Sequence, residues 1–135
     1  MARKKKPNYI YTVGRRKSAS ARVRLYRGKG ESTVNEKPIA DYFPGIIGKN
    51  EWTKPFKTLD VSDKYFVSAK VIGGGIQSQL DAVVHGISRA LRKAKEEYKK
   101  PLKKAGLLTR DSRIRERRKI DTGGKARRKK QSPKR

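Results

Sequence analysis

The residues of this chain whose types and spacing suit chemistry are clustered cations. Residues 15–17 read Arg-Arg-Lys and follow Gly14 in what we expect to be the loop between two strands, and Arg22 and Arg24 continue the cationic surface. The first 30 residues include 11 basic and no acidic residues, so nothing nearby in the sequence can neutralise them. Guanidinium and ammonium groups bind phosphate oxygens. We therefore predict a nucleic-acid contact here, in preference to a solvated hairpin tip.

Three consecutive glycines offer a second place for phosphate chemistry. Gly73, Gly74 and Gly75 lie between an expected strand and an expected helix, and a helix N-terminus favours phosphate because its first N–H groups have no partner within the helix. A dinucleotide-binding motif would need a further glycine at Ser78, and the lysine of a P-loop is missing. We interpret the glycines as a tight turn from strand to helix that at most touches an RNA phosphate.

Acid-base and metal chemistry are disfavoured by the composition. His85 is the single histidine, and no nucleophile or paired carboxylate lies beside it in the sequence, so we expect a surface residue rather than a general base. The chain has no cysteine, which excludes thiolate metal sites, and one histidine cannot form a histidine cluster. A phosphotransferase would need an arrangement of metal-binding carboxylates that we do not recognise. We predict no enzymatic activity, no cofactor and no bound metal.

Strands must position most of these cations. β-Branched and aromatic residues predict strands over residues 9–13, 21–26, 32–34 and 65–72. In the second of these strands apolar and cationic positions alternate, so one face is apolar and the other carries Arg22 and Arg24. Residues 35–37 are typical of a turn, and Pro38 is expected to open a short helix through Phe43.

A long helix is the clearest element of the sequence. Apolar residues recur at spacings of three and four from Ile76 to Ala94, which predicts an amphipathic helix of about 20 residues. Its opposite face carries His85 and Arg89, so this helix too is apolar on one side and partly cationic on the other. A second, short helix is expected just before Gly106, a residue that suits a C-cap.

Charge divides the chain into parts. The 135 residues carry a net charge of +26, of which residues 1–30 contribute +11, residues 31–98 contribute +1 and residues 99–135 contribute +14. With 33% hydrophobic residues in the chain, the near-neutral centre can build one small core. The predicted parts are a basic N-terminal extension over residues 1–8, a globular RNA-binding domain over 9–106 and an extended basic C-terminal tail over 107–135.

The tail has too few apolar residues to fold alone. From Asp111 onward its large aliphatic residues are Ile114 and Ile120, which cannot offset the entropy of ordering, so we expect disorder in the free protein. Fully extended, this stretch reaches at most about 80 Å. Residues 125–130, Lys-Ala-Arg-Arg-Lys-Lys, form either a nonspecific basic arm or an arm that enters a crevice of folded RNA.

A polyanion must balance the net charge, because a compact domain with so many cations repels itself. Nucleic acid offers the densest fixed negative charge and is favoured over an anionic membrane or an acidic protein. The chain has no run of about 18 apolar residues that would span a bilayer. Its first residues lead into no secretory signal, so we expect a cytosolic location. The alternative function is that of a free, chromatin-like condensing protein, although such a protein needs no near-neutral folded centre.

Motifs that are individually common follow one another here in a specific order. They are Val13-Gly14-Arg15-Arg16-Lys17, Ala21-Arg22-Val23, residues 35–43, Gly73-Gly74-Gly75, Arg89-Ala90-Leu91, Leu107-Leu108-Thr109-Arg110-Asp111, Lys125-Ala126-Arg127-Arg128 and Lys134-Arg135. In this order and spacing, and over nearly the whole chain, the sequence resembles the small-subunit ribosomal protein nine family in its bacterial form.

The resemblance implies an α+β fold, with a small four-stranded sheet packed on helices, a left-handed βαβ crossover and a long basic C-terminal tail. It also implies a structural protein of the small ribosomal subunit, bound in the head to the 3′ domain of the ribosomal RNA beside neighbouring head proteins. The tail would reach peptidyl-site tRNA. The chain departs from the family at two places: Pro133 stands where relatives usually have serine, and Ser112 where proline is common.

Eleven cations of the chain are expected to bind ribosomal RNA and two to approach tRNA. Those expected to bind ribosomal RNA are Arg15, Arg16, Lys17, Arg22, Arg24, Arg89, Arg110, Arg113, Lys125, Arg127 and Arg128. The resemblance implies that Lys134 and Arg135 approach the anticodon stem-loop of the tRNA.

Overall fold

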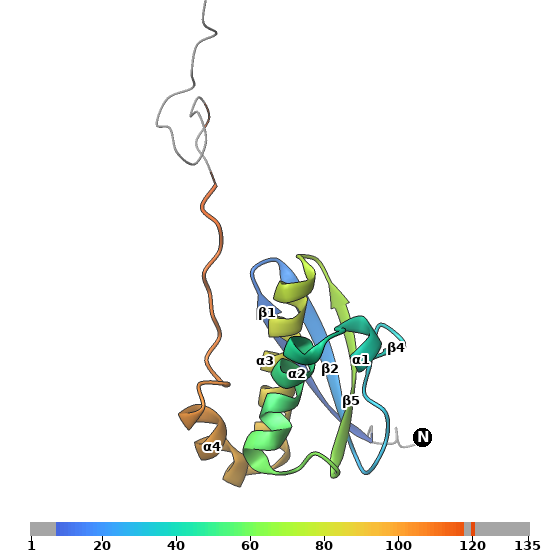
Figure 1. Ribbon diagram of the computed structural model, residues 1–135. Helices are drawn as coiled ribbons and strands as arrows, with labels where there is room; N and C mark the ends of the chain where they lie inside the picture. Colours follow the sequence, from blue (N-terminus) through green and yellow to red (C-terminus); the bar gives the residue numbers. More distant parts are fainter. Residues whose placement is uncertain (1–7, 118–119, 121–135) are drawn as a thin grey trace, which may run out of the picture.

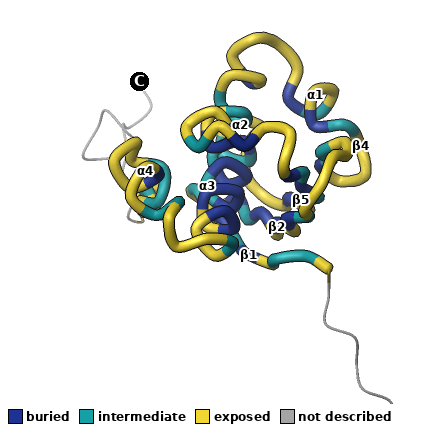
Figure 2. Tube along the Cα trace, turned by 90° about the horizontal axis from the view of Figure 1, so that it is seen from below, coloured by how far each residue is buried: buried dark blue, intermediate teal, exposed yellow. Residues whose placement is uncertain are grey.

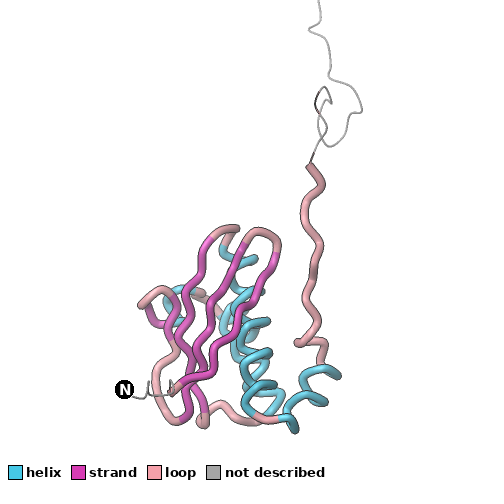
Figure 3. Tube along the Cα trace, turned by 180° about the vertical axis from the view of Figure 1, so that it is seen from behind, coloured by secondary structure: helices cyan, strands magenta, loops and turns pink. Residues whose placement is uncertain are grey.

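One mixed sheet with helices against one face forms the fold. The computed structural model describes residues 8–117 and 120. The elements are strands β1 (Tyr9–Arg16), β2 (Ala19–Arg27), β3 (Thr33–Val34), β4 (Lys37–Pro38) and β5 (Tyr65–Ile72), helices α1 (Ile39–Tyr42), α2 (Ile46–Leu59), α3 (Ile76–Ala94) and α4 (Lys99–Lys104), and the 3-10 turn η1 (Glu96–Tyr98) (Figure 1). The strand order is β1-β2-β5-β3-β4. Helices α2 and α3 lie behind the strands in Figure 3. The predicted α+β class is confirmed.

The hairpin of β1 and β2 aligns the cations of the N-terminal third. Its antiparallel register runs from the pair of Tyr9 and Tyr26 to the pair of Arg16 and Ala19, with the turn at Lys17, whose φ is 52°. Along β2 buried and exposed residues alternate as predicted, because successive side chains of a strand point to opposite faces. Arg22 and Arg24 therefore stand on the face of the sheet that carries no helix, whereas Arg16 lies on the helix side, 3.6 Å from the carboxylate of Asp81 in α3.

A parallel connection links β3 to β5. The two strands pair in parallel, and the chain between them passes through β4, α1 and α2. The sheet has five strands rather than the expected four, because Asn35 and Glu36 both adopt left-handed conformations and turn the chain back into the two-residue strand β4. Consequently the helix begins at Ile39, one residue later than expected. The left-handed sense of the connection stays a prediction.

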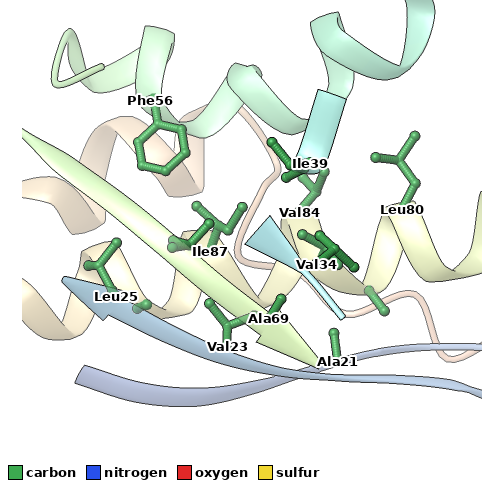
Figure 4. Close-up of a cluster of buried hydrophobic side chains, with 14 of the residues drawn as sticks. Ala21, Val23, Leu25, Val34, Ile39, Phe56, Ala69, Leu80, Val84 and Ile87 are labelled. Carbon is green, nitrogen blue, oxygen red and sulfur yellow. The ribbon is translucent and has the colours of Figure 1, made fainter. Parts of the chain in front are cut away.

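Helix α2 was not predicted, and its sequence explains why. It contains Pro55, and its first two residues, Ile46 and Ile47, are 79% and 76% exposed, so its apolar residues do not follow a clear helical period. Its buried anchor is Phe56, which packs above α3 and β5 (Figure 4). The helix is held by this packing more than by a regular apolar stripe.

The core lies between α3 and the sheet. The helix is buried over most of its length (Figure 2), and Ile87 faces Val23 and Leu25 of β2 (Figure 4). The predicted helix agrees with the observed one from its first residue to its last. Ile76 is an exception within it: we expected this residue on the buried face, but it is 66% exposed because it starts the helix at the end of the sheet.

Two glycines let β1 and α3 approach backbone to backbone. A Cβ added to Gly14 would lie 1.9 Å from the Ala82 carbonyl oxygen and 2.5 Å from the Gly86 nitrogen. A Cβ added to Gly86 would lie 2.5 Å from the Val23 side chain. The hydroxyl of Thr12 donates a hydrogen bond of 2.7 Å to the Gly86 carbonyl and fixes the contact. Edge strand β1 is therefore held closely along the helix.

The C-terminal segment begins where the second predicted helix ends. Helix α4 stops before Gly106, whose φ is +76° as a C-cap glycine requires, and Leu107 and Leu108 still pack partly against the core. Residues 109–117 then run away from α4 as an extended segment (Figure 1). The predicted disorder of the far tail falls mostly on residues 118–119 and 121–135, which lie outside the described residues. No helix in the described part of the chain is long and apolar enough to cross a membrane.

Candidate nucleic-acid interface

The open face of the sheet carries a row of aligned cations. The strand register places Arg22 opposite both Val13 and Lys70, and Arg24 opposite both Tyr11 and Ser68. Arg22, Arg24 and Lys70 are all exposed. Because residues two apart on a strand are separated by about 6.7 Å, the rigid sheet holds the two arginines at a fixed spacing. Lys70 was not predicted as a contact, although the alternation of residues 65–72 places it on the exposed face.

Aromatic rings fill one end of the same face. Tyr9, Tyr26 and Phe66 occupy one row across three strands, with ring centres 5.7 Å and 5.1 Å apart, and the last two rings are stacked. The guanidinium of Arg24 lies 4.9 Å from the centre of the Tyr9 ring. This cation–π contact keeps Arg24 against the sheet while leaving it exposed.

A second basic surface follows the outer edge of β1. We name it the edge groove; its lining comprises the cations Arg15, Arg89, Arg92, Lys93 and Arg110, one acidic residue, Glu96, and Tyr11, Thr12, Val13 and His85. Two hollows lie along it, of about 530 Å³ and about 260 Å³, and Arg89 and Val13 line both. A guanidinium N–H of Arg89 donates a hydrogen bond to the backbone carbonyl of Val13, so the helix and the strand edge are joined inside the groove.

An ion-pair cluster ties the hairpin to the C-terminal segment. Arg16 lies 3.6 Å from the Asp81 carboxylate and 2.9 Å from that of Asp111, which is in turn 2.7 Å from Arg113. The hydrogen bonds from the Arg113 side chain and backbone, together with the charge of Arg16, hold the pKa of Asp111 well below its usual range. The Asp111 carboxylate is therefore ionised throughout the neutral range, and the C-terminal segment leaves the domain from a fixed point beside β1.

We had expected His85 to be a surface residue, but it is partly buried in the wall of the edge groove. Burial lowers its pKa; Arg89 and Arg110 act in the same direction, and the Leu108 backbone opposes them. The ring is therefore neutral at pH 7. Its Nδ1 atom is buried and has no hydrogen-bond partner among the described residues.

The predicted contacts separate into three groups. Exposed side chains belong to Arg15, Lys17, Arg22, Arg24, Arg89 and Arg110. Arg16 and Arg113 engage carboxylates of the chain itself, although the Arg113 side chain stays exposed. The pairing of Arg16 with Asp111 had no signal in the sequence because the two residues are far apart along it. Lys125, Arg127, Arg128, Lys134 and Arg135 lie outside the described residues. RNA contact by all of these residues stays a prediction.

The three glycines at positions 73–75 have a structural role in the turn between β5 and α3. Gly73 and Gly74 have positive φ, and a Cβ on Gly73 would lie 2.5 Å from the Ser18 carbonyl oxygen, so the turn packs directly against the β1–β2 hairpin. The side chain of Gln79 donates to the Gly73 carbonyl at 3.1 Å. These contacts confirm the tight strand-to-helix turn.

The chemistry of the interface is cationic and polar. Among residues 8–117 and 120 no group of three histidine, cysteine or acidic residues could hold a metal ion. An α+β domain with a cationic sheet face and a cationic edge presents the kind of charge that a polyanion would neutralise. The profile of the family described as ribosomal protein S9/S16 matches residues 14–135. The chain belongs to this family, whose members are structural proteins of the ribosome and not enzymes.

Individual relatives agree with this assignment. The chain is 48% identical over 115 residues to the small ribosomal subunit protein uS9 of Desulfotalea psychrophila. The aligned residues make up 85% of this chain and 88% of the relative. It is 47% identical over 126 residues to uS9 of Rickettsia africae, covering 93% and 79%. For uS9 of Leifsonia xyli the identity is 50% over 108 residues, covering 79% and 64%.

Proposed function

We propose that this protein is a structural constituent of the small ribosomal subunit and acts in the cytoplasm. It binds the 3′ domain of the small-subunit ribosomal RNA in the head, beside neighbouring head proteins. The observation that carries the proposal is the two-sided basic surface around β1, on a domain whose family membership is established. One side is the sheet face with Arg22 and Arg24, and the other is the edge groove.

The mechanism is electrostatic. Phosphate oxygens of converging RNA segments accept hydrogen bonds from guanidinium groups, and each neutralised phosphate releases counterions. The sheet and α3 supply rigid spacing, so the cations meet phosphates without first having to be ordered. Two RNA segments, one on the sheet face and one along the edge groove, can thus be held at a fixed relative position.

Binding to separate RNA domains tests the proposal. The full chain should bind a transcript of the 3′ domain at least about tenfold more tightly than transcripts of the other domains in filter binding at 0.3 M salt, where nonspecific phosphate contacts are weakened about equally. A condensing protein would bind all transcripts alike. Equal affinities at this salt concentration would therefore contradict the ribosomal assignment and favour that alternative.

The same proposal gives the C-terminal tail a role at the peptidyl-site tRNA. Lys134 and Arg135 carry two charges that would contact the anticodon stem-loop. At about 1 kcal/mol for each screened phosphate contact, deleting residues 131–135 should weaken tRNA binding to isolated small subunits up to about thirtyfold, with assembly intact.

Side-by-side measurement on parent and mutant subunits decides this point, with assembly checked by sedimentation. A full-length variant with Lys134→Gln and Arg135→Gln separates charge from length and should reproduce most of the loss. Unchanged tRNA affinity in normally assembled subunits would rule out the tail contact and leave the RNA-scaffold role standing.

A further inference from the structure

The smaller hollow of the edge groove brings together three arginines from three different segments. Arg15 comes from β1, Arg89 from α3 and Arg110 from the C-terminal segment, and His85 completes the lining with Val13. The three arginines are separated by up to 95 positions in the sequence, so they meet only because α3 packs on β1 and Asp111 ties the C-terminal segment to Arg16. The hollow measures about 260 Å³.

The cations of this hollow are not balanced from within the described residues. Asp81 and Asp111, the acidic residues of the neighbouring hollow, are both engaged by Arg16, and Asp111 also by Arg113. Within the part of the chain that the structure describes, no carboxylate lies within ion-pair distance of Arg15, Arg89 or Arg110. Three converging positive charges repel one another, and an anion placed between them removes that repulsion.

Its polar groups match a phosphate in particular. Arginine side chains present planar, forked N–H donors that suit phosphate oxygens, and the partly buried ring of His85 forms part of the wall. The hollow has room for a single phosphate with a few waters.

We propose that this hollow is a socket for one phosphate group of the bound RNA, held by Arg15, Arg89 and Arg110 against His85. The inference rests on the proposed function and adds to it one defined contact among many diffuse ones. Arg110 is the chain neighbour of Asp111, which forms an ion pair with Arg16. A phosphate bound by Arg110 therefore also holds the start of the C-terminal segment against β1 and α3. RNA binding and the direction in which this segment leaves the domain are thereby coupled.

The single histidine makes the socket directly observable. In an untagged chain the imidazole C–H signals in a proton NMR spectrum belong to His85 alone. Inorganic phosphate, added at pH 7 and constant ionic strength, should move these signals along a saturable curve, whereas acetate should not. In the Arg110→Gln variant the apparent phosphate dissociation constant should rise about tenfold, as expected for the loss of a charge-assisted hydrogen bond. Lys104→Gln, an equal change of charge on α4, should leave the curve unaltered.

The outcomes separate the socket from the function. Signals that do not move with phosphate, that move equally with acetate, or that move equally in the Arg110→Gln variant overturn the socket. If selective binding to the 3′-domain transcript persists in that case, the proposed function still stands. A saturable, Arg110-dependent response in a chain that shows no preference among the transcripts supports an anion socket and counts against the ribosomal assignment.

Discussion

The variant Gly14→Ala is expected to be at least about 3 kcal/mol less stable than the parent protein, at the upper end of what overpacking costs. The new methyl group would lie 1.9 Å from the Ala82 carbonyl oxygen. That oxygen and the Gly86 nitrogen belong to the helix backbone, so no side-chain rotation can make room. The whole of β1 would have to move away from α3, which would also break the hydrogen bond from Thr12 to Gly86. Since small domains are stable by about 5–15 kcal/mol, a substantial fraction of the stability is at stake.

Urea unfolding followed by circular dichroism measures this loss as a lower midpoint. The matched control is Gly75→Ala, a change in the same chain at a position where an added Cβ meets nothing within 4 Å. The control should unfold close to the parent midpoint. An unchanged midpoint for Gly14→Ala would show that the approach of β1 to α3 is looser than described.

Replacing Arg15, Arg16 and Lys17 together with alanine is expected to weaken binding to RNA of any sequence and to flatten its salt dependence. Three lost phosphate contacts would lower the slope of log affinity against log salt by up to about 3 units. Because Arg16 is engaged by Asp81 and Asp111, we expect two contacts to be lost and a change closer to about 1.8 units.

Two further variants test this account of the triplet. Arg15→Ala with Lys17→Ala should show nearly the whole change in slope. Arg16→Ala should instead lower the midpoint of urea unfolding, because it leaves Asp81 and Asp111 without this partner. The control for net charge is Lys54→Ala with Lys57→Ala on α2, away from the sheet face. It removes two positive charges, as many as Arg15→Ala with Lys17→Ala. A slope that stays constant in the triple variant would remove the hairpin from the RNA-binding surface.

The parts of the fold that could be predicted are those in which neighbouring residues carry the signal. The alternation along β2 and the period of α3 reflect the burial of one face, and both elements were found close to their observed bounds. Helix α2 was not predicted from the sequence because Phe56 and Pro55 are buried while Ile46 and Ile47 are exposed, so its apolar residues do not follow a helical period. Strand β4 was not predicted because its two residues are too few to show the alternation of a strand.

The cations of the interface could be named from the sequence, but their partners could not. Charge alone indicated Arg15, Arg16 and Arg89, whereas the engagement of Arg16 by Asp111 depends on where the chain returns after α4. The position of His85 beside Arg110 likewise depends on tertiary packing, so the sequence indicated a surface residue. Such relations between distant residues have no local signature.

The free edge of β1 has a consequence for the protein before it reaches RNA. Unpaired strand edges are templates on which a second copy can add a strand, the usual first step of sheet aggregation. Here Arg89 donates a hydrogen bond to the Val13 carbonyl oxygen, so this acceptor is not free to pair with another strand. Two copies that approached edge to edge would also bring their Arg15 and Arg92 side chains together. The cations that we propose to bind phosphate in the assembled state would thus also keep newly made copies apart. Concentrated salt, which screens this repulsion within a few ångströms, would remove the protection and promote self-association of the unassembled protein.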